Sequence, residues 1–397
     1  MRLFDDGAVN LDILRERAFN YRWAEVPDGV IPLTAADPDF PVAKEITDAL
    51  ISYIGGGYLP YTPKLGIPAF REAVSRHLRE CKGEEVPADL VLPIDSAARG
   101  MYVIARTVLR PGDEAIVFDP VDYLFKNAVL AAGATPVFFP TRIVDGKIDF
   151  SLLESYITPR TRMIGLCNPH NPLGKVYPRE DLEHILSLAE KYDLWIMNDE
   201  IWSDITYGEA PFLSILSLGA RRNRRTLSVY GFSKAFGVAG LRIGCIYCTD
   251  PEIFGRIVEE SAVMTTAGGI ASVSQIAGTA CLEKAGYWTK EFLVHLKKNR
   301  DYAVERINGM RGLSTVRPEA TYLLWIDIRE TGVENTAFCD FLQERAQLAL
   351  VAGSEKMFGP GGRGYVRLCF ATSRAILTEG LDRLERGMEL LWRENGR

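Results

Sequence analysis

The sequence lacks a long apolar run and has almost no concentration of positive charge. No stretch approaches the ~18 consecutive apolar residues that cross a bilayer, so we expect no membrane span. The formal net charge is -6, and the one Lys/Arg block is the short turn "ARRNRR" at residues 220–225. An acidic chain with so small a basic patch is not expected to bind nucleic acid. The N-terminus "MRLFDDGAVNLD" is acidic and has no signal-peptide core, which predicts a cytoplasmic protein.

Cysteine usage is ordinary, at seven residues, and it indicates neither a disulfide framework nor a metal site. Cys245 and Cys248 form a lone CxxC in "IGCIYC". That segment has the pattern of a strand, in which residues three apart point to opposite faces, and no second pair follows. We therefore expect reduced thiols and no bound metal.

The length of 397 residues and the 47% hydrophobic content predict two domains. The middle of the chain alternates short apolar runs with helical patterns such as residues 179–192. Strands are expected at 114–118, 135–139, 162–167, 194–198, 226–230 and 244–248. This alternation predicts an α/β fold with a doubly wound, mostly parallel sheet.

The C-terminal third has a different pattern, which predicts a smaller α+β domain. Strands are expected at residues 321–328 and 364–371, and helices are expected at residues 336–347 and 376–392. Residues 278–307 are expected to form one long helical stretch that links the two domains. The predicted large domain covers residues 46–289, and the predicted small domain covers 1–45 plus 290–397.

Three turns after expected strands carry unusual polar residues. Asn171 lies in "CNPHNPLGKVY", Asp199 ends "LWIMND", and Lys234 follows "TLSVYGFS". Each residue alone is more readily a turn residue, a helix cap or an ion-pair partner. Together they would meet at the carboxyl edge of the sheet, where ligands of such folds bind. Pyridoxal phosphate needs an amine for its aldehyde, a carboxylate for its ring nitrogen and, for its phosphate, an arginine such as Arg242.

At this point the chain resembles the class I/II aminotransferase family of the fold type I pyridoxal-phosphate enzymes. The resemblance extends over nearly the whole length, in the family's order. It rests on "YLPYTPKLGIPAFREAV", "LRPGDEAIVFDP", "NPHNPLGK", "NDEIW", "SKAFGVAGLRIG" and "YVRLCFA". The segments "AADPDFP", "PEATYLLWID" and "MFGPGGRGYVRLCF" look most like the MalY/PatB cystathionine β-lyase-like branch.

The resemblance implies a role for each matching residue. Lys234 and Asp199 correspond to the catalytic Schiff-base lysine and the carboxylate on the pyridine nitrogen. The other implied contacts are Asn171 on the ring hydroxyl, Arg242 with Ser96, Ala97 and Ala98 on the phosphate, and Arg367 on the substrate carboxylate. Tyr61 corresponds to a tyrosine that reaches the phosphate of a neighbouring subunit, which implies a homodimer with shared active sites, to which residues 264–275 also contribute.

Several positions depart from the family pattern. Trp202 stands where a tyrosine is usual, and Gly231 stands where a phosphate-binding serine is usual, so Ser233 is a candidate replacement. Asp122 occupies the place of the aromatic residue that stacks on the cofactor, and Tyr123 comes one residue later. Either Tyr123 stacks after a shift of the turn, or the Asp122 carboxylate faces the site, where it binds a cationic substrate tail or acts as an acid/base. Asp37 is a second candidate for such an acidic lining.

The resemblance implies an enzyme that acts at Cα of an L-amino acid, and we expect an aminotransferase that produces a 2-keto acid. One alternative is a β-eliminating C–S lyase, or an enzyme that eliminates and cyclises an arginine-like amino acid. An alternative of another class is a pyridoxal-phosphate-binding regulator. The acidic composition and the absence of a basic N-terminal module argue against that alternative.

Overall fold

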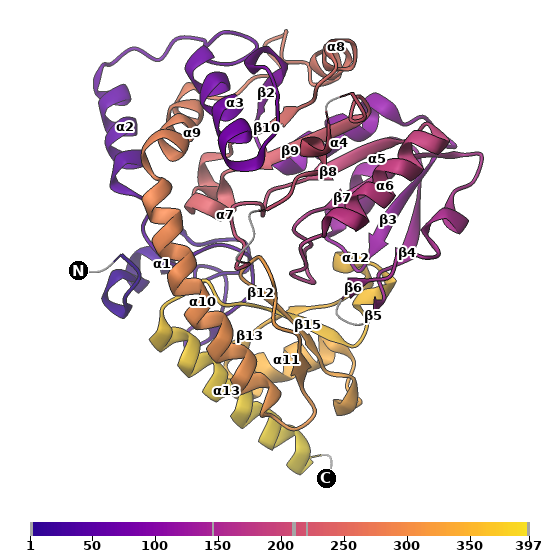
Figure 1. Ribbon diagram of the computed structural model, residues 1–397. Helices are drawn as coiled ribbons and strands as arrows, with labels where there is room; N and C mark the ends of the chain where they lie inside the picture. The colour runs from indigo at the N-terminus through magenta and orange to yellow at the C-terminus, as the bar shows by residue number, and fades with distance from the viewer. Residues whose placement is uncertain (1–2, 145–146, 209–211, 220, 395–397) are drawn as a thin grey trace. The chain divides into compact units, whose positions relative to one another are not determined.

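We describe the protein from a computed structural model that defines residues 3–144, 147–208, 212–219 and 221–394 (Figure 1). The chain divides into two compact units. The large unit consists of Val42–Pro169 and Val176–Thr289. The small unit consists of the chain up to Pro41, the short segment His170–Lys175 and the chain from Lys290 onward.

The large unit is built on a sheet in which seven strands are found within the described residues, in the order β2-β10-β9-β8-β7-β3-β4. Their bounds are β2 Val91–Ile94, β3 Glu114–Asp119, β4 Thr135–Pro140, β7 Thr161–Cys167, β8 Trp195–Asp199, β9 Thr226–Gly231 and β10 Gly244–Tyr247. Strands β4, β3, β7, β8 and β9 are parallel neighbours, whereas β10 is antiparallel to both β9 and β2. The hairpin β5 Ile143–Val144 and β6 Lys147–Ile148 lies apart from this sheet.

The apolar composition of the central strands follows from their burial on both faces. Every residue of β3 and β9 is buried, and only Arg162 of β7 is exposed. Strands covered on both faces have continuous apolar runs rather than alternating ones. The predicted α/β class with a mostly parallel sheet is therefore confirmed.

Strand β2 was not predicted, because "VLPI" is short and contains Pro93. A proline is tolerated in β2 because β2 is an edge strand.

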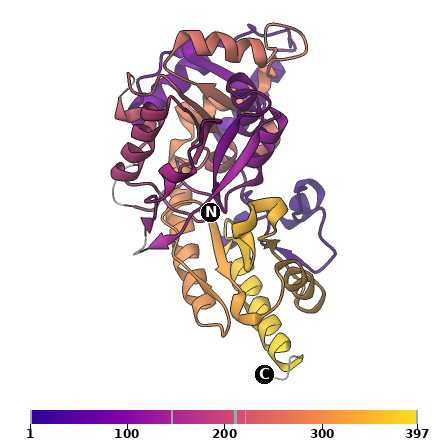
Figure 2. The same cartoon turned by 90° about the vertical axis from the view of Figure 1, so that its right-hand side faces the viewer.

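Helices cover both faces of this sheet, as Figure 2 shows at right angles to Figure 1. The helices of the large unit are α2 Lys44–Gly55, α3 Pro68–Lys82, α4 Ala97–Val108, α5 Tyr123–Ala131, α6 Arg179–Tyr192, α7 Ser233–Phe236, α8 Pro251–Glu260 and α9 Ser272–Lys284. With this strand order, right-handed crossovers place α4 and α5 on one face and α6 on the other. Helix α6 has the predicted bounds because it begins after Pro178 and ends at Asp193, which adopts the left-handed conformation that closes a helix.

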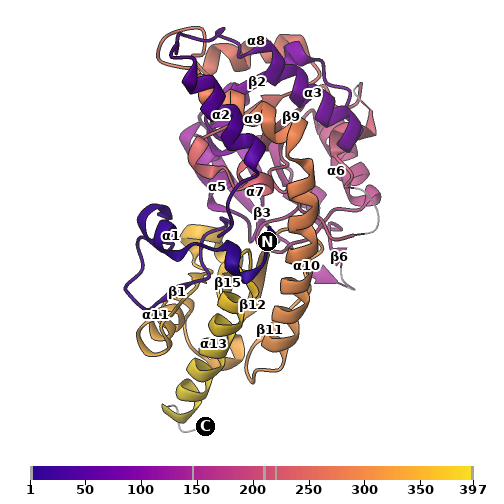
Figure 3. The same cartoon turned by 90° about the vertical axis from the view of Figure 1, so that its left-hand side faces the viewer.

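The small unit has an antiparallel sheet whose described strands are ordered β11-β12-β15-β14, together with the parallel pair β1-β13. The strands are β1 Ile31–Pro32, β11 Ser314–Thr315, β12 Leu323–Asp327, β13 Leu348–Ala349, β14 Val351–Ala352 and β15 Tyr365–Cys369. The helices are α1 Leu11–Arg17, α11 Asn335–Ala346, α12 Glu355–Phe358, α13 Arg374–Glu394 and most of α10 Gly286–Asn308. Helices α10 and α13 run side by side (Figure 3), and Arg306 of α10 forms an ion pair with Asp382 of α13 at 2.8 Å.

The expected single helical stretch over residues 278–307 is wrong, because it consists of two helices. Helix α9 ends at Lys284 and α10 begins at Gly286, while Ala285 between them has a non-helical φ of -103°. Ala285 and Trp288 are both buried at this junction, with 0% and 1% exposure. The change of helix at Ala285 therefore accompanies burial of a large aromatic side chain, which helical periodicity alone does not predict.

Candidate active site

The carboxyl ends of three neighbouring strands lie level at one edge of the large-unit sheet. Cys167 at the end of β7 pairs with Asp199 at the end of β8, and Asp199 pairs with Val229 of β9. Strand β9 ends at Gly231, and Lys234 follows in the short helix α7. The sheet thus brings Asp199 and Lys234 to the same edge, as the sequence predicts.

Asp199 is held in an environment that opposes its ionisation. Its side chain is 7% exposed, and its Oδ1 accepts a hydrogen bond from the Ile201 backbone N–H at 3.0 Å. Burial raises the pKa of Asp199 to about 7, assisted by the charges of Asp122 and Glu200 and opposed by Lys234. A carboxylate in these surroundings gains most from a cationic partner, such as a protonated pyridine nitrogen.

The amine of Lys234 lies over the ring of Trp202, with its Nζ 5.6 Å from the ring centroid. Trp202 is only 2% exposed, so this aromatic face is largely shielded from water. An aromatic face attracts an ammonium group through its quadrupole. The tryptophan that replaces the family's usual tyrosine therefore contacts the lysine that the sequence predicts to be catalytic.

The start of helix α4 offers backbone amides for an anion. Ser96 caps this helix by accepting a hydrogen bond from the Arg99 N–H at 3.1 Å. Ala97 and Ala98 occupy the first turn, where backbone N–H groups have no acceptor within the helix. Free amides and the helix dipole favour a phosphate at such a position.

Two glycines allow the neighbouring strands to approach the start of α4. A Cβ at Gly244 would lie 2.9 Å from the Ala97 nitrogen, too close for any side chain. A Cβ at Gly231 would lie 2.9 Å from two carbons of the Ile201 side chain and 3.4 Å from the Ala97 Cβ. Ile201 thus occupies the space that the family's usual serine would need, which explains the glycine physically.

Arg242 and Ser233, the other predicted phosphate contacts, follow β9 on either side of Gly237. Ser233 is the first residue of α7, and Gly237 closes α7 with a φ of 69°. Arg242 is exposed and adopts a left-handed conformation with a φ of 49°, just before β10. The Ser274 hydroxyl donates a hydrogen bond of 2.6 Å to the Leu241 carbonyl, which stabilises this turn.

Asp122 and Tyr123 lie at the start of α5. Asp122 is the N-cap residue, and its Oδ1 accepts a hydrogen bond from the Leu124 N–H at 3.1 Å. Both side chains are half-buried. The Asp122 charge nevertheless contributes to the raised pKa of Asp199, so its carboxylate acts electrostatically on the strand-end site.

Tyr61 belongs to an apolar, exposed loop of the large unit. Its exposure is 94%, and its neighbours Tyr58 and Leu59 are 84% and 61% exposed. An exposed apolar cluster of this kind is typical of a surface that another protein covers.

The remaining predicted site residues belong to the small unit. Arg367 of β15 donates a hydrogen bond from Nη1 to Asn171 Oδ1 at 3.2 Å, and its guanidinium lies 5.2 Å from the Phe358 ring centroid. Arg367 and Asn171 are 7% and 6% exposed. Asp37 is half-buried, and with Asp39 it outweighs the effect of burial and raises the pKa of Arg22. The predicted carboxylate-binding arginine is thus held in a defined orientation.

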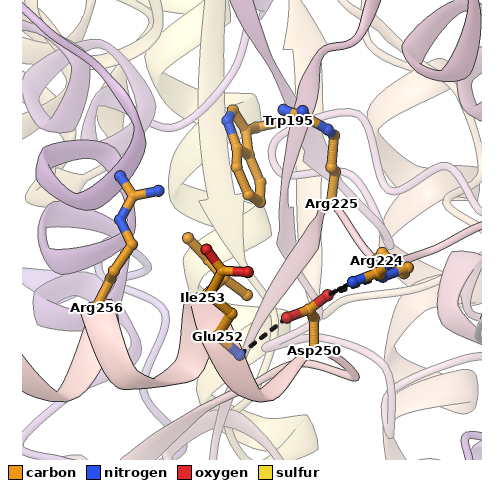
Figure 4. A pocket seen from close by; sticks show the side chains of 7 residues that line it. All are labelled: Trp195, Arg224, Arg225, Asp250, Glu252, Ile253 and Arg256. Carbon is orange, nitrogen blue, oxygen red and sulfur yellow. Dashed lines mark hydrogen bonds and ion pairs between the residues drawn. The ribbon is translucent and has the colours of Figure 1, made fainter.

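The arginine-rich turn of the sequence has structural partners within the large unit. Arg222 pairs with Glu183 at 2.6 Å, Arg224 with Asp250 at 2.6 Å, and Arg225 with Asp193 at 2.7 Å. A hollow of about 390 Å³ lies beside this turn. Figure 4 shows the residues that line it: Trp195, Arg224, Arg225, Asp250, Glu252, Ile253 and Arg256. These ion pairs support a structural interpretation of the basic block.

Next to Asp199 lies a group of buried charged side chains that sequence patterns did not predict. Lys82, Glu84 and Glu200 are all buried, and Lys82 Nζ lies 3.2 Å from Glu200. The one feature of the sequence that pointed to this group is the pair of consecutive acidic residues, Asp199 and Glu200, at the end of β8. Lys82 and Glu84 gave no signal, because "ECKGEE" has the pattern of an exposed helix end.

A lysine and an aspartate at the ends of neighbouring parallel strands, beside an anion-binding helix start, define the class of pyridoxal-phosphate-dependent α/β enzymes. The family model "Aminotransferase class I and II" matches residues 28–384. The chain belongs to the class I and II aminotransferase family. It is an aminotransferase, and its cofactor is pyridoxal 5′-phosphate.

Relatives of known name agree with this assignment. The bifunctional aspartate aminotransferase and glutamate/aspartate-prephenate aminotransferase of Petunia hybrida is 33% identical over 375 residues, covering 90% of this chain and 76% of the relative. The arginine–pyruvate transaminase of Pseudomonas aeruginosa is 30% identical over 387 residues, covering 96% and 95%. The prediction of an aminotransferase is confirmed, and these relatives do not favour the β-elimination alternative.

Solved structures share the fold. The aromatic aminotransferase from Pyrococcus horikoshii superposes with a TM-score of 0.85 at 29% identity, covering 93% of this chain and 97% of that one. Cystalysin from Treponema denticola, whose crystal structure contains pyridoxal 5′-phosphate, superposes with a TM-score of 0.90 at 24% identity, covering 98% and 100%. At this sequence identity, the similarity to cystalysin shows a shared fold and nothing more.

Proposed function

We propose that Lys234 and Asp199 are catalytic residues in the transfer of the amino group of an L-amino acid, and that Asn171 and Arg367 bind the cofactor and the substrate in this reaction. The observation that carries this proposal is that the carboxyl ends of β8 and β9 lie side by side. Asp199 and Lys234 are thereby brought to the same edge of the sheet. When bound, pyridoxal phosphate supplies an aldehyde that reacts with amines and a protonated ring that accepts electrons from the substrate Cα. The chain supplies the matching groups: an amine, a buried carboxylate and an anion-binding helix start.

In this proposal each cofactor-binding group contacts a different part of the cofactor. The Asp199 carboxylate holds the proton on the ring nitrogen, which relieves the cost of its own burial. The first-turn amides after Ser96, together with Ser233 and Arg242, hold the phosphate. The small-unit amide of Asn171 holds the ring hydroxyl.

Lys234 moves the proton. Its Nζ accepts the proton from the substrate Cα as an uncharged amine and becomes an ammonium. The face of Trp202 then stabilises this ammonium by about 1 kcal/mol, the order expected of a partly shielded cation–π contact. Arg367, held by Asn171 and Phe358, binds the substrate carboxylate through two parallel hydrogen bonds and so restricts the orientation of the substrate.

We propose further that the substrate carries a positively charged side chain. The support is Asp122, whose charge acts on the strand-end site where the family has an uncharged aromatic residue. Asp37 is the second acidic candidate. A carboxylate attracts an ammonium or guanidinium tail and repels the carboxylate tail of aspartate. The arginine–pyruvate transaminase among the relatives acts on a substrate of the favoured kind.

A second copy of the chain is the proposed cover for the exposed loop that contains Tyr58, Leu59 and Tyr61. Cyclic homodimers are the commonest symmetric assembly, and the loop is too apolar to suit a fully exposed position. In this arrangement Tyr61 and residues 264–275 would serve the cofactor of the partner subunit.

We also propose a cytoplasmic location. Among the described residues, no helix has the length and apolar content of a membrane span.

The decisive experiment follows the absorbance of the cofactor-loaded enzyme while single amino acids are added, and then identifies the products. Arginine, lysine and ornithine should give their 2-keto acids and the amine form of the cofactor, and aspartate should react poorly. Asp122→Asn should reduce the preference for arginine over an uncharged amino acid by about tenfold, the loss of ~1.4 kcal/mol. Pyruvate and ammonia without the amine form would indicate β-elimination and overturn the proposal.

Attachment of the cofactor provides a separate test. Reduction with borohydride, followed by peptide mass spectrometry, should locate the cofactor on Lys234. Lys234→Ala should abolish the labelled peptide, whereas the exposed Lys191→Ala should retain it. Labelling of another lysine in the wild-type protein would contradict the assignment.

A further inference from the structure

A second buried carboxylate, Glu200, directly follows Asp199. Its side chain has 0% exposure, and its oxygens accept hydrogen bonds from four side chains. The donors are Ser214 Oγ at 2.5 Å, Asn198 Nδ2 at 2.8 Å, Lys82 Nζ at 3.2 Å and the Tyr247 hydroxyl at 3.3 Å. So many donors stabilise the ionised form of a carboxyl group. We name these five residues, together with Glu84, the Glu200 cluster.

The Glu200 cluster contains more carboxyl groups than cations. Lys82 contributes one ammonium, while Glu84 and Glu200 contribute two carboxyl groups, all of them buried. A dry, uncompensated negative charge is costly, so one of the two carboxyl groups must carry a proton. Glu200 has four donors, whereas neither oxygen of Glu84 accepts a well-formed hydrogen bond among the described residues, although its side chain lies near those of Glu200 and Ser214. The proton therefore belongs on Glu84, and burial, followed by the charge of Glu200, raises the pKa of Glu84 well above its ordinary value.

The groups that surround the cluster leave this charge count unchanged. His77 and Asp204 form their own ion pair, with Nε2 and Oδ1 3.2 Å apart. Burial opposes the charge on His77, but Asp204 outweighs it and raises the pKa of His77 to about 9. The Tyr230 hydroxyl donates to Asp204 at 2.6 Å, and its ring lies 4.3 Å from Lys82 Nζ. Burial raises the pKa of the nearby Cys245 thiol to about 12, so this group stays uncharged.

The cluster connects the ends of the two strands that carry the active-site residues. The Asn198 amide donates to both Glu200 and Ser228 Oγ, the latter at 2.9 Å, and thereby joins β8 to β9. The Glu200 N–H donates to the Val229 carbonyl at 3.1 Å. Asp199 lies between Asn198 and Glu200 and cannot move unless these contacts break.

We infer that Glu200 is a positioning residue for Asp199, with Lys82 as its counter-ion and Glu84 as its buried acidic neighbour. This inference rests on the proposed role of Asp199. Glu200 fixes the backbone on both sides of that residue, and its negative charge increases the proton affinity at the Asp199 carboxylate. The ring nitrogen that Asp199 binds therefore keeps its proton to higher pH than it would without Glu200.

The first test locates the proton. In protein labelled with ¹³C-glutamate, infrared spectra at neutral pH should contain a protonated-carboxyl C=O band. Glu84→Gln should remove this band and leave the urea midpoint unchanged, because glutamine replaces a neutral group of similar shape. The neighbouring exposed residue offers the matched control, and Glu85→Gln should retain the band. Persistence of the band in Glu84→Gln would overturn the inferred charge state.

The second test measures positioning through the bound cofactor. Glu200→Gln should lower the pH at which the absorbance of the bound cofactor titrates by about one unit, since a nearby negative charge is lost. Glu84→Gln should not shift this titration. Lys82→Met is expected to unfold or aggregate, and the double variant Lys82→Met/Glu200→Gln should recover folding because both charges are removed together. An unshifted titration in Glu200→Gln, or no recovery in the double variant, would contradict the inference.

Failure of the inference is distinguishable from failure of the proposed function. If Asp199→Asn retained the cofactor spectrum of the wild type, the assignment of Asp199 would be wrong. The infrared band and the recovery of folding in the double variant would still report on the cluster. If Asp199→Asn altered the spectrum and Glu200→Gln did not, only the positioning role would be refuted.

Discussion

Replacement of Asp199 by asparagine in the cofactor-free protein should remove a pH-dependent cost of folding. The pKa of Asp199 is raised, mainly by burial, from its ordinary 3.8 to about 7. Because each unit corresponds to ~1.36 kcal/mol, the folded protein disfavours the ionised carboxylate by about 4 kcal/mol. A raised pKa means that this contribution to stability is complete below about pH 4 and is lost as the pH rises through about 7. Asparagine does not titrate in this pH range, so the variant does not lose this contribution to stability as the pH rises.

The assay is urea unfolding of the cofactor-free wild type and Asp199→Asn at about pH 5 and about pH 8. Linkage predicts that the free energy of unfolding of the variant, relative to the wild type, increases by about 2.5 kcal/mol between these conditions. Asp12→Asn is the control, because the Asp12 side chain is 96% exposed and its replacement should give a difference independent of pH. Equal differences for Asp199→Asn at both pH values would refute the argument from burial.

Three further predictions concern the surroundings of the site. Gly231→Ser should lower the free energy of unfolding by about 1–3 kcal/mol, since its Cβ would overlap Ile201, and adding Ile201→Ala should recover most of the loss in urea titrations. Arg367→Lys should raise KM for the amino acid at least ~10-fold without weakening cofactor binding, because lysine cannot form two parallel hydrogen bonds; unchanged steady-state kinetics would contradict this. The His77 pKa of about 9 predicts a contribution to stability that is complete below about pH 6.5 and lost as the pH rises through about 9. Relative to His77→Asn, the wild type should lose about 3 kcal/mol over that window, and a flat difference in chemical denaturation would exclude it.

Local patterns predicted most of the large-unit sheet and the residues at its edge. The strands are apolar because they are buried on both faces, and a polar residue after such a strand stands out from its surroundings. Asp199 and Lys234 were detectable for that reason, and their order along the chain also indicated the family. Helix α6 was predicted from apolar residues at helical spacing, and its observed bounds agree because a proline precedes it and Asp193 closes it. These signals are all carried by neighbours in sequence.

Contacts between distant segments decided what the sequence could not show. Lys82 meets Glu200 across 118 positions, and Asn171 meets Arg367 across 196. Ile201 explains the glycine at 231 only once β8 and β9 lie side by side. In the same way, the burial of Lys82 and Glu84 depends on the packing of α3 against the sheet. The sequence by itself determined the fold class, the family and the residues expected to hold the cofactor. Only the tertiary structure decided the charge of each buried group, because proton affinity depends on burial and on the partners that folding provides.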